Sequence, residues 1–282
     1  MSRLAPSPLT YRTHPTMTFT RLLLLASTLL FATPVFATTC DTDDYQLKVS
    51  GLEQCLYMRR YGDPTPKILL IWLHGDVSSG GPATYHFRST EKAAEDFAAD
   101  KTLSIALVRP GYPDGSGNTS GVSLLNTGRA DHHTKTNITE VGTAIERLRE
   151  HYKPAKVIAI GHSGGASTSA VLLGLKPGLI DAAGLVACPC DLVTWRTGRR
   201  AWTASENAMT WIDAIDKNAK VISLTGERAD NTLPILARNY TDALTARGIQ
   251  AEFRLLPNEN HNSAFRSDEV FKAVRDLIGS IR

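Results

Sequence analysis

The sequence predicts an α/β fold in which helices cover both faces of a mostly parallel, twisted sheet. Continuous apolar runs such as Lys67–Leu73 and Leu103–Val108 are typical of strands buried on both faces. These runs alternate along the chain with longer segments whose apolar residues recur at helical spacing, as a parallel sheet with crossover helices requires. The length of 282 residues and the 42% hydrophobic content suit a single domain with a sizeable core.

The first two expected strands differ from the buried ones, because only one of their faces is apolar. Tyr45–Val49 and Cys55–Arg59 alternate apolar and polar residues, which predicts an antiparallel hairpin with one wet face. The elements expected after this hairpin are a strand over 67–73, a helix over 84–99, a strand over 103–108, a helix over 137–151 and a strand over 157–160.

The second half continues the alternation with one interruption. The expected elements are a helix over 164–175, a strand over 179–187, a strand over 220–225, a helix over 233–247, a strand over 252–256 and a closing helix over 265–281. Residues 191–216 break the pattern, with three tryptophans and one possible helix from Ser205. We expect a small cap over a pocket here, unless the tryptophans only pack against the base of the pocket.

A serine stands at the turn between the strand over 157–160 and the helix that follows it. The turn reads Gly161-His162-Ser163-Gly164-Gly165, which has the pattern G-x-S-x-G. Glycines flank a strained turn of this kind because a Cβ there would collide with the neighbouring strand or helix. The pattern therefore predicts that the Ser163 hydroxyl stands out above the edge of the sheet as a nucleophile.

Two further residue types complete the chemistry, because a serine hydroxyl needs a base and an orienting acid. His261 is the only histidine in the loop before the closing helix, and it is the candidate base. Asp230, in the turn after the strand over 220–225, is the preferred acid. Glu227 lies closer to the end of that strand, and Asp191 follows the preceding strand, so both stay open as alternatives.

Taken together, these motifs resemble the α/β-hydrolase superfamily over essentially the whole mature chain. They are the G-x-S-x-G turn at 161–165, His74-Gly75-Asp76, the turn over 226–230 and His261. The candidate serine, acid and histidine follow one another along the chain in the order typical of that family. Arg109-Pro110-Gly111-Tyr112 also resembles a loop that many members carry. The turn over 226–230 is similar to the corresponding turn in the prolyl-oligopeptidase-like and dienelactone-hydrolase-like branches. The chain lacks the propeller domain of the first branch, and it has Ser where the second has Cys.

The resemblance implies acyl transfer through a catalytic triad of Ser163, Asp230 and His261. The oxyanion of the tetrahedral intermediate needs two backbone N–H donors. By the same resemblance one is the amide of Gly164, and the other is the amide of Asp76, in preference to Val77.

The main functional hypothesis is therefore a secreted serine hydrolase that cleaves small-molecule esters or small amides without a cofactor. A serine peptidase of the prolyl-oligopeptidase-like type is the alternative within enzymes. A catalytically silent α/β-hydrolase fold used as a binding module is the alternative from another class. Asp76 and Asp114 favour a cationic group in the pocket. Asp131-His132-His133 resembles a set of metal ligands, but no partner cluster is evident, so we expect a polar loop and no metal.

The N-terminal 37 residues predict a secretory signal peptide rather than part of the fold. Arg21 precedes the apolar run 22–31, and Val35-Phe36-Ala37 supplies small residues for cleavage. The run is shorter than the roughly 20 residues of a membrane span, so we expect no stable membrane anchor after cleavage. The mature chain, over 38–282, is then a single exported domain, periplasmic or extracellular. The sequence does not decide whether Met1 or Met17 is the start.

Four cysteines in an exported chain suggest disulfides. The simplest pairing joins Cys40 to Cys55 and Cys188 to Cys190. A redox role for Cys188-Pro189-Cys190 is the alternative, but redox dithiols favour the spacing C-x-x-C.

The charge pattern excludes one class of partner. The net charge is only +3, and no run of Lys and Arg or basic stripe with aromatic residues occurs. Nucleic acid is therefore not an expected partner. The sequence makes no prediction about the oligomeric state.

Overall fold

The computed structural model describes residues 39–124 and 128–281. The predicted signal peptide over 1–37 lies outside the described residues. No helix in the described ranges is long and apolar enough to cross a membrane.

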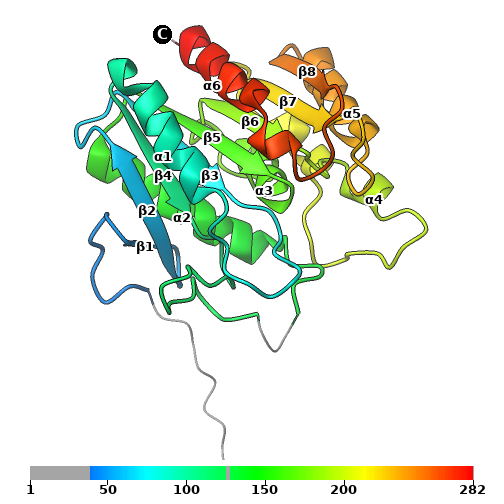
Figure 1. Cartoon of the computed structure of the whole chain (residues 1–282). Helices are drawn as coiled ribbons and strands as arrows, with labels where there is room; N and C mark the ends of the chain where they lie inside the picture. Colours follow the sequence, from blue (N-terminus) through cyan, green and yellow to red (C-terminus); the bar gives the residue numbers. More distant parts are fainter. Residues whose placement is uncertain (1–38, 125–127, 282) are drawn as a thin grey trace, which may run out of the picture. The chain divides into compact units, whose positions relative to one another are not determined.

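One eight-stranded sheet organises the described part of the chain (Figure 1). Its spatial order is β1-β2-β4-β3-β5-β6-β7-β8. The β1–β2 and β2–β4 pairs are antiparallel, and every later pair is parallel. The strands are β1 (Lys48–Ser50), β2 (Cys55–Gly62), β3 (Ile68–Leu73), β4 (Thr102–Leu107), β5 (Lys156–His162), β6 (Ala182–Val186), β7 (Lys220–Gly226) and β8 (Gln250–Leu256).

Helices connect these strands at nearly every crossover. The α-helices are α1 (Phe87–Asp96), α2 (Lys135–Tyr152), α3 (Gly164–Leu175), α4 (Leu192–Trp195), α5 (Pro234–Ala246) and α6 (Asp268–Ser280). Short 3₁₀ helices are η1 (Ala98–Asp100), η2 (Ala208–Ala214) and η3 (Ala264–Arg266). The predicted α/β architecture is therefore confirmed.

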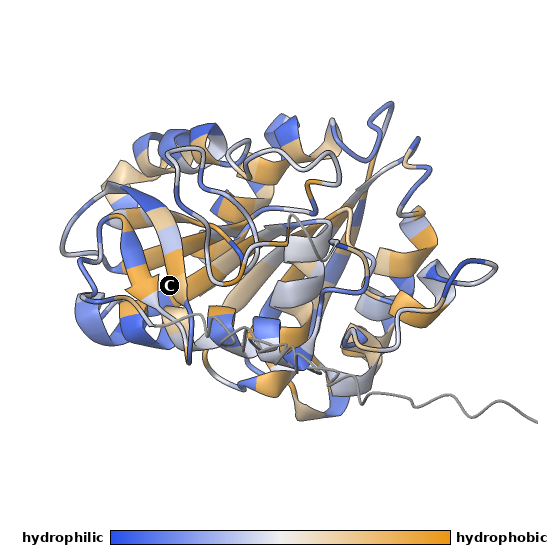
Figure 2. Cartoon of the chain, turned by 90° about the horizontal axis from the view of Figure 1, so that it is seen from below, coloured by the Kyte–Doolittle hydropathy of each residue, from blue (hydrophilic) through white to orange (hydrophobic). Residues whose placement is uncertain are grey.

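The helices divide between the two faces of the sheet, as Figure 1 shows for α1 and α6 on one side and α2 and α3 on the other. Strand β3 explains this division, because successive side chains point to opposite faces. Leu69 and Ile71 belong to the core cluster beneath α2, α3 and α5, whereas Leu70 and Trp72 belong to the cluster beneath α1 and α6. Figure 2 shows the apolar colour concentrated on the strands.

The predicted elements differ from the observed ones mainly at their ends. The closing helix begins at Asp268 instead of residue 265, because the Ser267 hydroxyl accepts a hydrogen bond from the amide of Glu269 and caps the helix there. In the interrupting segment, the helix expected from Ser205 is the 3₁₀ helix η2, with Asn207 as its cap.

Both predicted disulfides are present. Cys40 is bonded to Cys55 at the start of β2, and Cys188 is bonded to Cys190 just after β6. The second pair is almost completely buried. A buried disulfide that packs in the core fits a structural role better than an exposed redox centre.

Candidate active site

Ser163 lies at the end of β5, where the strand turns into α3. Its backbone is in an unusual conformation for a residue with a side chain, with φ at 50° and ψ at −116°. Such a conformation costs about 1–3 kcal/mol, and it persists only where the surrounding structure holds it. The amide of Ser163 donates to the carbonyl oxygen of Val186 on the neighbouring β6, over 2.8 Å. This bond anchors the turn to the sheet.

The glycines on each side of Ser163 are required by close backbone contacts. A Cβ on Gly161 would collide with the carbonyl oxygen of Gly165 and the backbone of Ala166. A Cβ on Gly165 would collide with the carbonyl oxygen of Leu73 at the end of β3. The G-x-S-x-G pattern therefore has the steric basis that the sequence predicted.

His261 lies in the loop between β8 and η3, on the wall of the same pocket as Ser163. Its Nδ1 is 2.8 Å from the hydroxyl oxygen of Thr232, a residue that is fully buried. Burial lowers the pKa of His261 below its usual value, against the charges of Asp230 and Asp76, which raise it. The imidazole is therefore neutral near pH 7, as a base must be.

The three acids proposed from the sequence occupy different environments. Asp230 is exposed and influences His261 through its charge, but no hydrogen bond joins the two side chains. Asp191 caps α4 by accepting hydrogen bonds from the amide and hydroxyl of Thr194. Glu227 accepts a hydrogen bond from the amide of Asn258. Asp230 thus stays a prediction, and Thr232 is the residue that the sequence analysis missed.

Asp76 lies directly after β3 and is the centre of a buried polar cluster. One of its carboxylate oxygens is 2.5 Å from a guanidinium nitrogen of Arg109, which is only 4% exposed, and 3.0 Å from the hydroxyl of Tyr112. The other is 3.1 Å from Nε2 of His133. Burial would raise the pKa of Asp76, but His133 and Arg109 outweigh it and hold the pKa well below its usual value. Asp76 is therefore a carboxylate whose charge is compensated inside the protein.

This cluster supports the turn that carries the nucleophile. A Cβ added to Gly164 would meet the carboxylate of Asp76 at 2.5 Å, Nε2 of His133 at 2.7 Å and the guanidinium of Arg109 at 3.0 Å. The absence of a side chain at Gly164 therefore lets charged groups pack against the start of α3. Sequence reasoning identified Asp76 and Gly164 but gave no sign that Arg109 and His133 meet them.

A hydrogen-bonded chain links the loop after β3 to the loop that carries His261. The Gly75 amide donates to the Tyr85 hydroxyl over 2.5 Å, and this hydroxyl is 2.7 Å from Nδ1 of His162. Nε2 of His162 is 3.0 Å from the carbonyl oxygen of His261. Because a carbonyl only accepts, His162 carries its proton on Nε2 and accepts from Tyr85 at Nδ1. Burial and the charge of His261 lower the pKa of His162 to about 3, so the ring is neutral.

Ser163 and His261 face one pocket of about 730 Å³. Its other walls come from the loops after β3, β6 and β7 and from η3. Within the interrupting segment, Trp195 and Trp202 line this pocket, whereas Trp211 packs against Gly174 of α3. Two of the three tryptophans therefore face the candidate site, and the third belongs to the packing beneath it.

Asp114 and the Asp131-His132-His133 segment do not line this pocket. Asp114 is buried and accepts hydrogen bonds from Ser116 and Asn118 within its own loop. Asp131 accepts from the amides of Ala204 and Ser205, which ties two loops together. In the ranges that the structure describes, no three His, Cys, Asp or Glu residues are grouped so that they could hold a metal.

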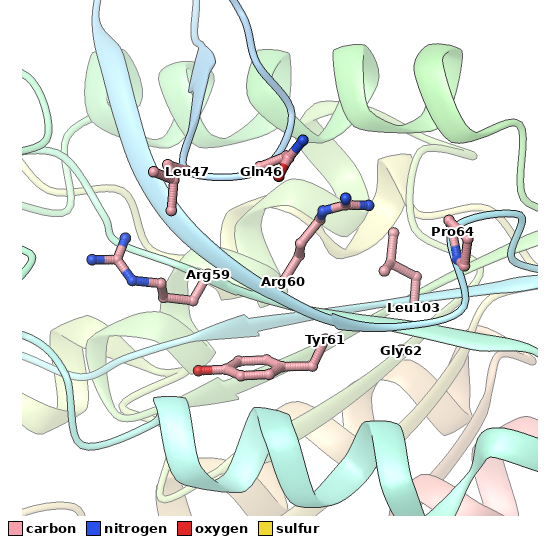
Figure 3. Close-up of a pocket in the computed structure, with 8 residues that line it drawn as sticks. All are labelled: Gln46, Leu47, Arg59, Arg60, Tyr61, Gly62, Pro64 and Leu103. Atoms are coloured by element: carbon pink, nitrogen blue, oxygen red, sulfur yellow. The ribbon is translucent and has the colours of Figure 1, made fainter.

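A second pocket, of about 440 Å³, lies along β2 and shares no residue with the Ser163 pocket (Figure 3). Figure 3 shows Arg60 and Tyr61 on opposite sides of the strand, as the alternation of a strand requires. Arg59 is already engaged, because its guanidinium donates to the hydroxyl of Ser116 over 2.7 Å. No serine, cysteine, histidine or carboxylate is among the described residues that line this pocket.

Solved structures with the same architecture are esterases, a lipase and a peptidase. Est1E from Butyrivibrio proteoclasticus is 11% identical, over 83% of this chain and 100% of that chain, with a TM-score of 0.59. Esterase Pf2001 from Pyrococcus furiosus is 16% identical, over 83% of this chain and 90% of that chain, with a TM-score of 0.59. The acylaminoacyl peptidase from Pyrococcus horikoshii is 9% identical over 81% of this chain, but the match spans only 39% of the peptidase, with a TM-score of 0.61.

No protein-family model and no curated protein sequence matches the chain. The likeness therefore rests on structure, and at this level of identity it establishes the fold alone. The chain has the α/β-hydrolase fold, which confirms the fold that its motifs implied.

Proposed function

We propose that the protein is a serine hydrolase that cleaves carboxylic esters or small amides through an acyl-enzyme on Ser163. The observation that carries this proposal is the pairing of two features in one pocket. Ser163 is held at the strained turn with φ at 50°, and His261, which burial keeps neutral, lines the same pocket. The solved esterases and the lipase of the same fold agree with such a reaction.

The proposed reaction has two balanced halves. Ser163 Oγ attacks the carbonyl carbon of the substrate while its proton passes to Nε2 of His261. The tetrahedral intermediate then collapses, the bond to the leaving group breaks, and the leaving group takes the proton from His261. Water repeats the sequence on the acyl-enzyme and releases the acid, which restores Ser163.

The amides of Gly164 and Asp76 are the proposed donors to the oxyanion. In the described part of the chain, neither amide donates to a protein acceptor, whereas the Gly75 amide donates to Tyr85. The Asp76 side chain is fixed by its charged cluster, which holds the adjacent backbone in place. A donor of this kind lowers the barrier by about 3 kcal/mol in measured cases.

His261 has two proposed orienting groups. The Thr232 hydroxyl accepts from Nδ1–H in the tautomer that leaves Nε2 free to take the serine proton. Asp230 is proposed to stabilise the imidazolium through its charge, because that charge raises the pKa of His261. A triad with Asp230 in direct contact remains the prediction from the sequence.

Export is a further part of the proposal. Two disulfides support an oxidising compartment, since such bonds are rare in reducing cytoplasm. The predicted signal peptide then delivers the domain to the periplasm or the exterior.

Hydrolysis assays test the reaction. We expect p-nitrophenyl acetate to be hydrolysed by the wild type and the rate to fall at least about 10⁴-fold in Ser163→Ala and in His261→Ala. Ser78→Ala is the matched control, because Ser78 lines the same pocket outside the turn. Equal activity in Ser163→Ala would refute the proposal. A parallel assay with an aminoacyl p-nitroanilide separates an esterase from a peptidase, the alternative that the peptidase of the same fold supports.

A further inference from the structure

The candidate active-site pocket carries three arginines at its walls. Arg196 and Arg199 come from the segment after α4, and Arg266 ends η3. Across the described residues, none of the three forms an ion pair with a carboxylate. Arg199 and Arg266 are exposed, so their guanidinium groups are available to a ligand.

The single carboxylate that lines this pocket does not balance these charges. Asp76 is already paired with Arg109 at 2.5 Å and contacts His133 at 3.1 Å. Asp114, the other acid expected to attract a cation, does not line the pocket. Asp76 lines the pocket as expected, but its charge is compensated by Arg109, and arginines outnumber acids among the lining residues.

Two indole rings lie beside the first of these arginines. The Trp195 and Trp202 rings meet edge to face, with centroids 5.0 Å apart. The guanidinium carbon of Arg196 is 5.2 Å from the first centroid and 4.9 Å from the second. These cation–π contacts hold Arg196 at the pocket without consuming its charge. The Nε of Arg196 donates to the carbonyl oxygen of Arg200 over 2.9 Å, so the wall offers an aromatic surface next to a cation that has no carboxylate partner among the described residues.

We propose that the pocket selects substrates that carry a carboxylate away from the scissile bond, attached to an aromatic or other flat apolar group. This inference rests on the proposed hydrolase function. A guanidinium group binds a carboxylate through two parallel hydrogen bonds, and three unpaired groups favour an anion over a neutral or cationic analogue. Contacts remote from the reacting carbonyl stabilise the bound substrate and the transition state equally. The favoured substrate should therefore have a lower KM and a similar kcat.

Three aryl acetates with the same acyl group test this preference. They are 4-acetoxybenzoate, its neutral methyl ester and the cationic 4-acetoxybenzyltrimethylammonium. Exposed ion pairs are individually weak, so we expect kcat/KM for the anion to exceed that of the methyl ester by roughly five- to tenfold, through KM. The cation should be the poorest substrate. Added 0.5 M NaCl should reduce the anion preference, because salt screens exposed charges.

Variants assign the preference to these arginines. The double variant Arg199→Gln/Arg266→Gln should lower the anion-to-neutral ratio of kcat/KM several-fold, because it removes two of the three guanidinium groups. Arg200→Gln is the matched control, since this exposed neighbour does not line the pocket, and it should keep the wild-type ratio. A wild type that prefers the neutral or cationic ester, or a double variant that keeps the full wild-type ratio, would overturn the inference.

A binding measurement separates failure of this inference from failure of the hydrolase proposal. The same three esters are titrated into Ser163→Ala protein while the fluorescence of the pocket tryptophans is followed. If the wild type hydrolyses none of the esters but Ser163→Ala binds the anion most tightly, the hydrolase proposal fails and the charge selection stands. Equal binding of all three would overturn the charge selection whatever the activity.

Discussion

His261 is the residue whose surroundings decide how the candidate site works. Its Nδ1 contacts the Thr232 hydroxyl at 2.8 Å, while the charge of Asp230 acts on it without a hydrogen bond. A neutral hydroxyl orients a ring but stabilises an imidazolium less than a carboxylate does. The two groups therefore make separable contributions.

Substitution of each group measures its contribution. We expect Thr232→Val to lower kcat by roughly 10-fold to 100-fold, because a buried hydrogen bond that orients the base is lost. Asp230→Asn should lower kcat less, because Asp230 is exposed and acts only through its charge. A loss of about 10⁴-fold in Asp230→Asn would contradict this order, since it would place the carboxylate in direct contact with His261 during the reaction. Glu227→Gln serves as the control, because its carboxylate faces the Asn258 amide.

The pH dependence of activity follows from the neutral state of His261. The base works unprotonated, so kcat/KM should fall as the pH drops through the pKa of His261. Because burial lowers that pKa below the usual 6.5, the midpoint of this fall should lie below pH 6.5. An activity profile with its midpoint at or above 7 would contradict this assignment.

Stability must be followed in the same titration. The buried rings of His86 and His162 have pKa values of about 3, well below those of the unfolded chain. The unfolded chain therefore binds more protons as the pH falls below about 6.5, and the fold loses stability from that pH downward. Thermal melting at each pH separates loss of fold from loss of the base.

At the scale of elements, the turn between β5 and α3 depends on how tightly it packs on β3. The Leu73 carbonyl oxygen lies where a side chain on Gly165 would stand. We expect Gly165→Ala to lower the free energy of unfolding by at least about 1–3 kcal/mol and to remove activity, because backbone must shift to relieve the clash. Denaturant unfolding measures this change.

Gly279 provides the matched control for that substitution. It lies in the last turn of α6, and a Cβ there would meet nothing within 4 Å. Gly279→Ala should therefore be neutral or stabilise the protein by up to about 1 kcal/mol, as expected for a helical glycine. Equal effects of the two substitutions would show that the turn has no special steric demand.

Strands were easier to predict from the sequence than helix ends. Strand β3 reads Ile-Leu-Leu-Ile-Trp-Leu, and an unbroken apolar run of this length fits only a strand covered on both faces. Helix ends were less predictable, because the cap at Ser267 is one of several polar residues before α6. The 3₁₀ helix η2 has too few residues to show a helical period.

At the scale of the whole molecule, the site is assembled from loops that are far apart in the sequence. The sequence could single out Ser163 and His261, which line one pocket, because a motif or a position before the last helix marks each one. Thr232 could not, since a threonine two residues after Asp230 has no distinguishing pattern. The pairing of Arg109 and His133 with Asp76 arises only when three loops converge, and no local spacing encodes it.

This convergence also sets which charges reach the pocket wall. The sequence displays Asp76 and Asp114 as free acids, but folding pairs each of them with nearby groups. The arginines after α4 read as a polar loop until their place on the pocket wall is known. The proposed charge selection thus depends on the assembled molecule.

The central claim, that Ser163 is an activated nucleophile, is tested most directly by a fluorophosphonate probe. The folded protein is treated with the probe and the modified residue is located by peptide mass spectrometry. We expect a stoichiometric adduct on Ser163, and none after unfolding or in Ser163→Ala, because activation needs His261 beside a preformed oxyanion site. No adduct in folded protein, or an adduct on Ser78 or Ser79 of the same pocket instead, would contradict the claim.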